Sequence, residues 1–220
     1  MSVVGVIPMK GHSERVPGKN LRLIAGRPLF HWITGSLLDA ALVDEVIVDT
    51  DSDEIEMAVK EAFPVVGVHR RPEHLLGDFV PMHDVVAHIA RMVDHDHLLQ
   101  THSTNPLLAP QTIDRAIKTY LENGEHDSLM SVTSWRSRFY FPDGRPVNHD
   151  PAELIRTQDL SPLLEENSNL YLASVALTRE TGRRVGKRPL LFEVDASESI
   201  DIDEQLDFEI AEFLLMRRHG

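Results

Sequence analysis

Short runs of apolar, largely β-branched residues alternate along this 220-residue chain with segments whose apolar residues recur at helical spacing. This alternation is typical of a parallel sheet flanked by helices. The predicted strands are residues 3–8, 46–48, 65–68, 98–100 and 129–132. The predicted helices are residues 29–41, 53–62, 82–93 and 112–122, and an amphipathic helix follows Asp203. The sequence therefore predicts an α/β fold with a mostly parallel sheet flanked by helices.

Length and composition favour one globular unit. A chain of this length can bury a large core, so we expect residues 1–220 to form a single domain. Cysteine is absent, which excludes disulfides, thiolate nucleophiles and sulfur-ligated metals. The first residues lead straight into a strand, and no apolar run reaches about 18 residues. We expect a soluble cytoplasmic protein with no membrane partner.

A glycine-rich, basic loop follows the predicted first strand and reads Gly-His-Ser-Glu-Arg-Val-Pro-Gly-Lys-Asn over residues 11–20. Residues 1–28 hold five Lys and Arg but one acid, Glu14, although the whole chain carries a net charge of −13. A local cationic segment in an acidic protein indicates a specific anionic ligand, because nucleic-acid binding would need a broad basic face. The loop therefore predicts phosphate binding without nucleic acid.

Two familiar phosphate-binding motifs do not fit this loop. Six residues separate Gly11 from Gly18, and Asn20 follows Lys19, whereas a P-loop has four residues there and then Ser or Thr. Pro17 interrupts the spacing that a dinucleotide-binding fingerprint requires. A solvated surface turn remains the alternative on composition alone.

The loop carries the pattern Ile-Pro-x-Lys-x-x-Ser-x-x-Val-Pro-Gly-Lys-Asn-Leu over residues 7–21. This pattern resembles the signature of the acylneuraminate cytidylyltransferases, the CMP-sialic acid synthetases and related CMP-acidic-sugar synthetases. The resemblance continues, in the family's order, through residues 46–51, 71–73, 98–107, 167–171 and 199–207. It implies a Rossmann-like nucleotidyltransferase that transfers CMP from CTP to a small acidic sugar, releases pyrophosphate and requires Mg²⁺.

The resemblance also implies a homodimer. Residues 134–166 lose the alternating pattern and contain Trp135, three further aromatic residues and several prolines. So long an irregular segment is usually functional, and aromatic side chains are typical of a buried partner surface. In the family this region forms a protruding arm that contributes to the dimer interface and to the acceptor site of the partner.

Nucleotidyl transfer requires positive charge around phosphate oxygens. Lys19 is the first candidate, because it follows a Pro-Gly turn whose amides can face the same anion. Lys10 stands where the family usually has arginine, so it keeps the charge but loses the bidentate geometry. The resemblance assigns further nucleotide contacts to Ser13 and Asn20, with Arg15 as a spare cation. Arg71 resembles the contact to cytosine.

The magnesium candidates are Asp201 and Asp203, two residues apart, whose side chains would point to the same side of an extended segment. With Lys19 and Lys10, Asp201 is the predicted catalytic group. For Asp203 the alternative is a helix N-cap, because an amphipathic helix follows it. Asp49 and Asp51, at the end of the second predicted strand, are further candidates near the nucleotide. The loop and the aspartate pair must converge in space for this hypothesis to hold.

The acceptor candidates are Gln100, His102, Tyr171 and Arg156. His102 enters because two extra residues displace Gln100 relative to the family pattern. The sialic acid synthetases have an arginine six residues before this tyrosine, whereas this chain has Glu165, which would repel a carboxylate. Replacement charge can come from arm arginines, namely Arg136, Arg138 and Arg156. Alternatively, the acceptor is another ulosonic acid or a phosphonate.

Two other functions compete with the transferase. The chain has twelve histidines, including His83 beside Asp84, and such residues form the metal site of phosphohydrolases of the His-Asp type. That fold, however, is all-helical. A non-catalytic nucleotide-binding module would keep the loop without turnover. Lys10 and Glu165 favour the module, whereas Lys19 with the aspartate pair favours catalysis.

Overall fold

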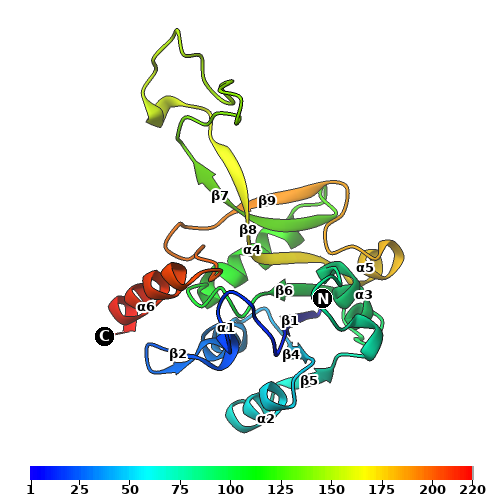
Figure 1. The fold of residues 1–220 in the computed structure, drawn as a ribbon. Helices are drawn as coiled ribbons and strands as arrows, with labels where there is room; N and C mark the ends of the chain where they lie inside the picture. The colour runs from blue at the N-terminus through cyan, green and yellow to red at the C-terminus, as the bar shows by residue number, and fades with distance from the viewer. Residues whose placement is uncertain (220) are drawn as a thin grey trace.

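The computed structural model describes residues 1–219, and in them one seven-stranded sheet carries helices on both faces (Figure 1). The sheet has the order β5-β4-β1-β6-β8-β7-β9. Its strands are β1 (Val3–Met9), β4 (Glu45–Thr50), β5 (Gly67–Arg70), β6 (His97–Thr101), β7 (Ser128–Trp135), β8 (Leu163–Ser174) and β9 (Pro189–Glu193). The helices are α1 (Leu29–Asp39), α2 (Asp53–Ala62), α3 (Met82–Ala90), α4 (Pro110–Glu122), α5 (Val175–Thr181) and α6 (Gln205–His219).

The sheet is mostly parallel, which confirms the predicted fold class. Parallel pairing joins β5 to β4, β4 to β1, β1 to β6 and β7 to β9. Strand β8 runs antiparallel to both β6 and β7. The sequence patterns did not predict β8, β9, α5 or the short hairpin of β2 (Leu23–Ile24) and β3 (Arg27–Pro28). The strand predicted at residues 65–68 begins two residues later, at Gly67.

The core has a separate apolar layer on each face of the sheet. Side chains alternate between the faces along β1, so Ile7 packs with α1, α2 and α4, whereas Val6 packs with α3 and α5. A third apolar cluster lies beneath α6, where Phe208 and Leu215 contact Ile24 and Leu107. Helix α6 therefore packs against the segment that carries the aspartate pair. None of the described helices is both long and apolar enough to cross a membrane.

The candidate site lies at one edge of the sheet, where the parallel strands β1, β4, β5 and β6 all end. Ligand sites of open α/β sheets form at this edge. Antiparallel β8 starts beyond this edge, at the arm, and reaches it at Leu170, which pairs with Thr101 at the end of β6. Strand β9 also ends there, and the segment after it leads to Asp201. Fold topology thus brings the loop at 10–20 close to residues 166–170 and 194–203.

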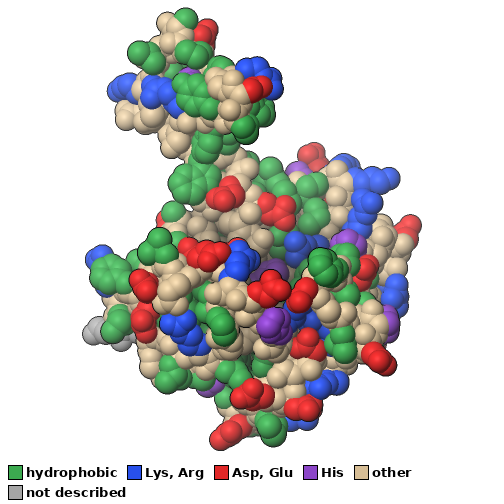
Figure 2. Space-filling view, in the orientation of Figure 1, with side chains coloured by type: hydrophobic (Ala, Val, Ile, Leu, Met, Phe, Trp, Pro, Cys, Tyr) green, Lys and Arg blue, Asp and Glu red, His purple; other side chains and the backbone are tan. Residues whose placement is uncertain are grey.

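Residues 136–162 form an arm that stands away from the body between β7 and β8 (Figures 1 and 2). The irregular segment is shorter than the predicted 134–166, because β7 continues to Trp135 and β8 starts at Leu163. The arm holds a short helical turn, η3 (Thr157–Asp159), and a bridge between Tyr140 and Pro146. Its apolar side chains are widely exposed, namely Tyr140, Phe141, Val147, Leu154 and Ile155.

Candidate active site

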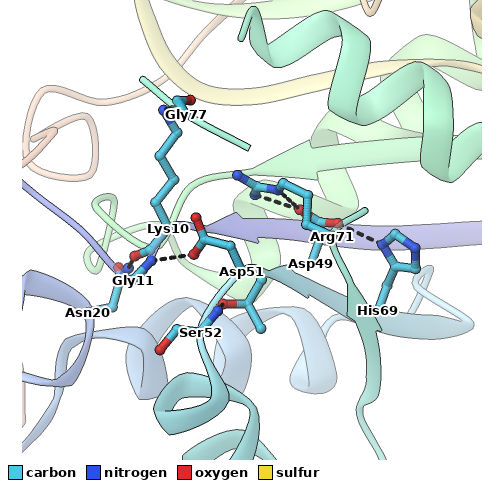
Figure 3. A network of polar contacts seen from close by, with 10 residues as sticks. Lys10, Gly11, Asn20, Asp49, Asp51, Ser52, His69, Arg71 and Gly77 are labelled. Atoms are coloured by element: carbon cyan, nitrogen blue, oxygen red, sulfur yellow. Dashed lines mark hydrogen bonds and ion pairs between the residues drawn. The ribbon is translucent and has the colours of Figure 1, made fainter. Parts of the chain in front are cut away.

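The basic loop is anchored to the end of β4 at its first residue. The backbone N–H of Gly11 donates to Asp51 Oδ1 at 2.6 Å (Figure 3). A Cβ atom at position 11 would lie 2.8 Å from the Cβ of Ser52, so only glycine permits this close approach. Asp51, which directly follows β4, therefore shapes the loop.

The loop closes at Gly18, whose φ of 63° lies in the left-handed region that favours glycine. A helical turn, η1 (Lys19–Leu21), follows at once. Lys19 Nζ donates to the carbonyl oxygen of Ile202 at 2.6 Å, across 183 residues of sequence. The predicted convergence of the loop with the aspartate pair is confirmed, because Ile202 lies between Asp201 and Asp203.

The environment of Lys19 prepares it to bind an anion. Burial lowers the pKa of its ammonium group, whereas the carboxylates of Asp201 and Asp203 act in the opposite direction. Its hydrogen bond to a neutral carbonyl can be exchanged for a phosphate oxygen. A partly desolvated cation in such a site interacts with a phosphate more strongly than an exposed one.

Asp203 pairs with the loop rather than capping α6. Arg15 Nη2 lies 2.6 Å from Asp203 Oδ1, and Arg15 Nη1 lies 3.7 Å from a Glu204 oxygen. The backbone N–H groups of Asp203 and Glu204 both donate to Asp207 Oδ2, at 3.0 and 2.7 Å. Asp207 thus satisfies the chain entering α6, and the carboxylate of Asp203 faces the loop. Arg15, predicted as a spare cation, is its partner.

Asp201 has the properties of a cation ligand. Burial raises the pKa of its carboxyl group, a hydrogen bond with the Thr104 side chain acts against this shift, and nearby Asp203 acts in the same direction as burial. Its Oδ1 is buried without a hydrogen-bond partner among the described residues. Ile202 is fully buried while its two neighbours are partly exposed, so both carboxylates lie on the open side of the segment. An unpaired buried carboxylate oxygen beside a second carboxylate fits a hard cation such as Mg²⁺.

A cavity of about 320 Å³ brings most of the predicted residues together. On the body of the molecule beneath the arm, Figure 2 shows basic, acidic and histidine side chains gathered on one face. The predicted residues that line the cavity are Lys10, Ser13, Lys19, Asn20, His102, Asp201 and Asp203. A larger cavity, of about 560 Å³, shares Ser168 and both aspartates and extends toward Trp135.

Lys10 and Asn20 are engaged with neighbouring protein groups. Lys10 Nζ donates to the Gly77 carbonyl at 3.1 Å and lies 3.6 Å from Asp78 (Figure 3). The Asn20 amide donates to the Lys10 carbonyl at 2.8 Å and accepts from the Ser103 hydroxyl at 2.6 Å. Asn20 therefore braces the loop against the end of β6. Lys10 Nζ has further N–H groups besides the one that it donates to Gly77.

Arg71 is buried in an ion pair. Its Nε donates to Asp49 Oδ1 at 2.6 Å, and its Nη2 lies 2.5 Å from the same oxygen (Figure 3). The second oxygen of Asp49 lies 2.6 Å from His69 Nδ1. Asp49 is therefore committed to orienting Arg71 and His69. The guanidinium is fixed at the strand edge that carries the loop, and the cavity described above does not include it.

Gln100, His102 and Tyr171 lie together on the neighbouring strands. Gln100 pairs with Tyr171 in the register of β6 and β8, and its amide Nε2 lies 2.8 Å from His102 Nε2. The Tyr171 hydroxyl donates to Glu166, and burial, together with this bond, raises the pKa of Tyr171 to about 12. Burial first, then the charges of Arg184 and Lys19, lowers the pKa of His102 to about 4. Both candidates suggested by the shifted spacing are therefore adjacent.

Arg184 belongs to this group, and the sequence patterns missed it. Its guanidinium carbon lies 3.7 Å from the centre of the Tyr171 ring, and its Nη1 donates to Gln100 Oε1 at 3.2 Å. The signal that could have found it is a basic stretch, Arg183 to Arg188, in a strongly acidic chain. The stretch alone does not place Arg184 at the site, because the preceding elements, β8 and α5, are not predicted from the sequence.

The arm arginines bond to the arm itself within one chain. Arg156 pairs with Asp159, with nitrogen–oxygen distances of 2.7 and 3.1 Å. Arg136 donates to the Leu160 carbonyl at 2.8 Å, and Arg138 donates to the Ile155 carbonyl at 2.5 Å. Arg156 is therefore the predicted acceptor residue that the structure does not bring to the others.

Glu165, the predicted departure from the family, accepts a hydrogen bond from the Trp135 indole at 2.7 Å at the base of the arm. The phosphohydrolase alternative finds no support, because the fold is α/β. His83 lies 3.5 Å from Asp84 with both side chains about half exposed. Among residues 1–219, the group of three or more ligands that could hold a metal is His12, Glu14 and Asp78, all exposed.

Comparison with known proteins identifies the family of this chain. A family model described as "Cytidylyltransferase" matches residues 4–215. The N-acylneuraminate cytidylyltransferase of Oncorhynchus mykiss is 30% identical over 224 residues, which are 98% of this chain and 50% of the relative. This chain therefore spans about half the length of that relative. The CMP-N,N'-diacetyllegionaminic acid synthase of Legionella pneumophila subsp. pneumophila is 29% identical, over 98% of this chain and 97% of the relative.

A solved structure shares the fold. The CMP:2-keto-3-deoxy-manno-octonic acid synthetase complexed with CTP superimposes with a TM-score of 0.75, covering 99% of this chain and all of that one, at 16% identity. The family match extends from β1 into α6 and so includes both the basic loop and the aspartate pair. The chain belongs to the cytidylyltransferase family.

Proposed function

We propose that this protein transfers CMP from CTP to an acidic sugar of the ulosonic acid class and releases pyrophosphate, with Mg²⁺ as its cofactor. The observation that carries the proposal is the contact of Lys19 with Ile202, which brings the basic loop against a pair of carboxylates. Family membership supports the choice of CTP. The printed names of the relatives support an acidic sugar as the acceptor.

The reaction joins an acceptor hydroxyl oxygen to the α-phosphorus of CTP and breaks the bond from that phosphorus to the bridging oxygen of pyrophosphate. Negative charge grows on the leaving oxygen, so fixed cations lower the barrier. Lys19 exchanges the Ile202 carbonyl for a phosphate oxygen, and Lys10 exchanges the Gly77 carbonyl in the same way. Ser13, Asn20 and Arg15 bind or support the remaining phosphate and nucleotide oxygens.

Asp201 and Asp203 would hold the magnesium ion. The ion supplies charge neutralisation of the triphosphate and polarises its phosphorus–oxygen bonds. Asp203 keeps one oxygen on Arg15, which leaves its second oxygen and the unpaired Oδ1 of Asp201 as ligands. Arg71 would present its remaining N–H groups to the cytosine carbonyl, because Asp49 holds the guanidinium in one orientation.

The acceptor would lie against His102, beside Lys19 and the aspartates, while the buried side chains of Gln100 and Tyr171 support this part of the site. His102 is neutral at physiological pH because its pKa is about 4, so it acts as a hydrogen-bonding group rather than a cation. Glu165 is the residue that argues against sialic acid as the acceptor, because its carboxylate would repel that of the sugar. Its hydrogen bond to Trp135 directs that carboxylate to the arm base, which is compatible with several ulosonic acids.

We also propose a homodimer in the cytoplasm, assembled through the arm. The support is the exposure of Tyr140, Phe141 and Leu154 on an arm that extends from the body. Large exposed apolar groups on a projecting segment are typical of a protein–protein interface. The arm of one subunit would then carry Arg156 to the acceptor site of the other.

The test is pyrophosphate release from CTP, compared with ATP, GTP and UTP, in the presence of Mg²⁺. The acceptors are an N-acylneuraminic acid, N,N'-diacetyllegionaminic acid, 2-keto-3-deoxy-manno-octonic acid and a phosphonate. We expect release with CTP and at least one ulosonic acid. CTP binding without release on any acceptor would instead identify a non-catalytic nucleotide-binding module.

A further inference from the structure

An arginine outside every predicted motif lies at the proposed acceptor site. Arg184 belongs to the segment after α5 that leads to β9, and its side chain is 22% exposed. It contacts two residues of that site, Gln100 through Nη1 and Tyr171 through its guanidinium face. Its Nη2 lies 3.7 Å from the carboxylate of Glu166.

We propose that Arg184 binds the carboxylate of the acceptor. It would supply the positive charge that is missing at position 165, where this chain has a glutamate instead of an arginine. This inference rests on the proposed function and specifies the residue that selects for an acid. Arg184 is a specificity residue of the acceptor site, and the arm arginines are not needed for this task.

The guanidinium is oriented but not saturated. Of its five N–H groups, one donates a hydrogen bond, to Gln100, among residues 1–219. Stacking on Tyr171 fixes the plane of the group and leaves its N–H groups free along the edges. A planar donor with fixed orientation is suited to grip a carboxylate through two parallel hydrogen bonds.

The carboxylates near Arg184 have other hydrogen-bond partners, so its guanidinium can still bind a further carboxylate. Glu166 lies near it, but its Oε1 already accepts a hydrogen bond from the Tyr171 hydroxyl. Glu165 bonds to Trp135 on the arm side. His102 stays neutral at physiological pH, so among the residues in contact with Gln100, Arg184 carries the positive charge. An incoming carboxylate would replace the weak contact with Glu166.

The position also fits the reaction geometry. His102 bonds to Gln100 and lines the cavity that holds Lys19 and Asp201. Ser168 contacts the Tyr171 hydroxyl at 3.2 Å and lines the same cavity. An acid bound to Arg184 would therefore lie one side chain away from the proposed triphosphate site. A hydroxyl close to the carboxylate of the same sugar could then reach the α-phosphorus.

The experiment measures KM and kcat for the best ulosonic acid, and KM for CTP, in the wild type, Arg184→Gln and Arg184→Lys. Glutamine keeps a planar polar group beside Gln100 but removes the charge. Lysine keeps the charge but loses the planar fork. Arg183→Gln is the matched control, because Arg183 is the exposed neighbour and its loss changes the net charge equally. Thermal melting of each variant checks the fold.

We expect Arg184→Gln to raise the acceptor KM about tenfold or more while the CTP KM stays within about twofold. Lysine should restore part of the affinity, and Arg183→Gln should match the wild type. A second readout uses the acceptor with its carboxylate converted to a primary amide. The wild type should discriminate strongly against the amide, and Arg184→Gln should lose most of that discrimination.

An unchanged acceptor KM in Arg184→Gln would overturn the inference while leaving the transferase intact. Equal losses on the acid and its amide would also overturn it, because they would indicate that Arg184 only positions Gln100 and Tyr171. Wild-type protein that releases no pyrophosphate with any sugar acid would overturn the proposed function itself, and this inference with it.

Discussion

The proposed nucleotide side and the proposed acceptor side of the site are built in different ways. On the nucleotide side, the loop at 10–20 follows directly from β1, and backbone anchors such as Gly11 to Asp51 fix its shape. On the acceptor side, Gln100, Tyr171 and Arg184 come from distant segments and meet only through the pairing of β6 with β8. The first side can therefore be recognised as a motif and the second only as a contact. The predictions below test this contrast, from the largest expected effect to the smallest.

Lys19→Ala should have the largest effect. It removes the cation that we place on the phosphates, at a cost of about 3 kcal/mol or more in transition-state stabilisation, or over about 100-fold in kcat/KM. The measurement is the rate of pyrophosphate release at saturating acceptor. Lys118→Ala is the control, because Lys118 is an exposed lysine on α4, 3.8 Å from Glu122. An activity loss below about tenfold would remove Lys19 from the phosphate site.

Asp201→Asn should separate function from stability. It should lower activity about tenfold or more and raise the Mg²⁺ concentration needed for half-maximal rate, because the amide is a poor ligand. Without metal it should raise the free energy of unfolding at pH 7, because a desolvated carboxylate is removed. Metal titrations and urea unfolding measure the two effects.

The raised pKa of Asp201 makes the free energy of unfolding depend on pH, because protonation and folding are linked. The pKa of Asp201 is raised in the folded protein, so the folded protein binds more protons than the unfolded chain over the interval between the two pKa values. This carboxyl therefore destabilises the fold at neutral pH and does so less as the pH falls. Asp203→Asn is the comparison, because Asp203 pairs with exposed Arg15. Unchanged magnesium dependence in Asp201→Asn would exclude it as a ligand.

The arm prediction concerns assembly. Leu154 is 80% exposed on the arm, so Leu154→Glu should leave the fold of one chain intact and weaken the dimer. Sedimentation equilibrium should show the wild type as a dimer and the variant largely as a monomer at the same concentration. Val65→Glu is the matched control, because Val65 is apolar and 78% exposed on the body. A monomeric wild type, or a variant that remains dimeric, would contradict arm-mediated assembly.

The last prediction has the smallest expected effect on activity and concerns the pH dependence of stability. The pKa of His102 falls from 6.5 to about 4, so between these values the unfolded chain binds the extra proton and stability rises with pH. His102→Gln should remove part of this dependence, on the order of 2 kcal/mol between pH 4 and pH 7. Urea unfolding at both pH values measures it, with His83→Gln as an exposed control. Equal pH dependence in wild type and His102→Gln would show that His102 is not desolvated.

The sequence predicted those parts of the molecule whose signals are local. The loop that carries Lys19 and the pair Asp201 and Asp203 are each contiguous, and β-branched runs marked the parallel strands. The structure confirmed that these segments converge. Asp203 could not be assigned from sequence, because an acid before a helix serves a cap and a metal equally well. The contact with Arg15 and the role of Asp207 decide against the cap.

Other parts depend on contacts that no local pattern reports. Strand β8 mixes acidic and amide residues with a short apolar stretch, and only pairing with β6 and β7 makes it a strand. Arg184 follows that strand and was missed with it. The burial of Arg71 against Asp49 also required coordinates, because strand ends often carry exposed charges.

The most direct test of the central claim is a crystal structure with Mg²⁺ and a CTP analogue whose α,β-bridging oxygen is replaced by methylene. We predict that Lys19 Nζ leaves the Ile202 carbonyl for a phosphate oxygen, and that Asp201 ligates the metal on the same triphosphate. A nucleotide bound elsewhere, with Lys19 still on Ile202 and no metal at Asp201, would contradict the account.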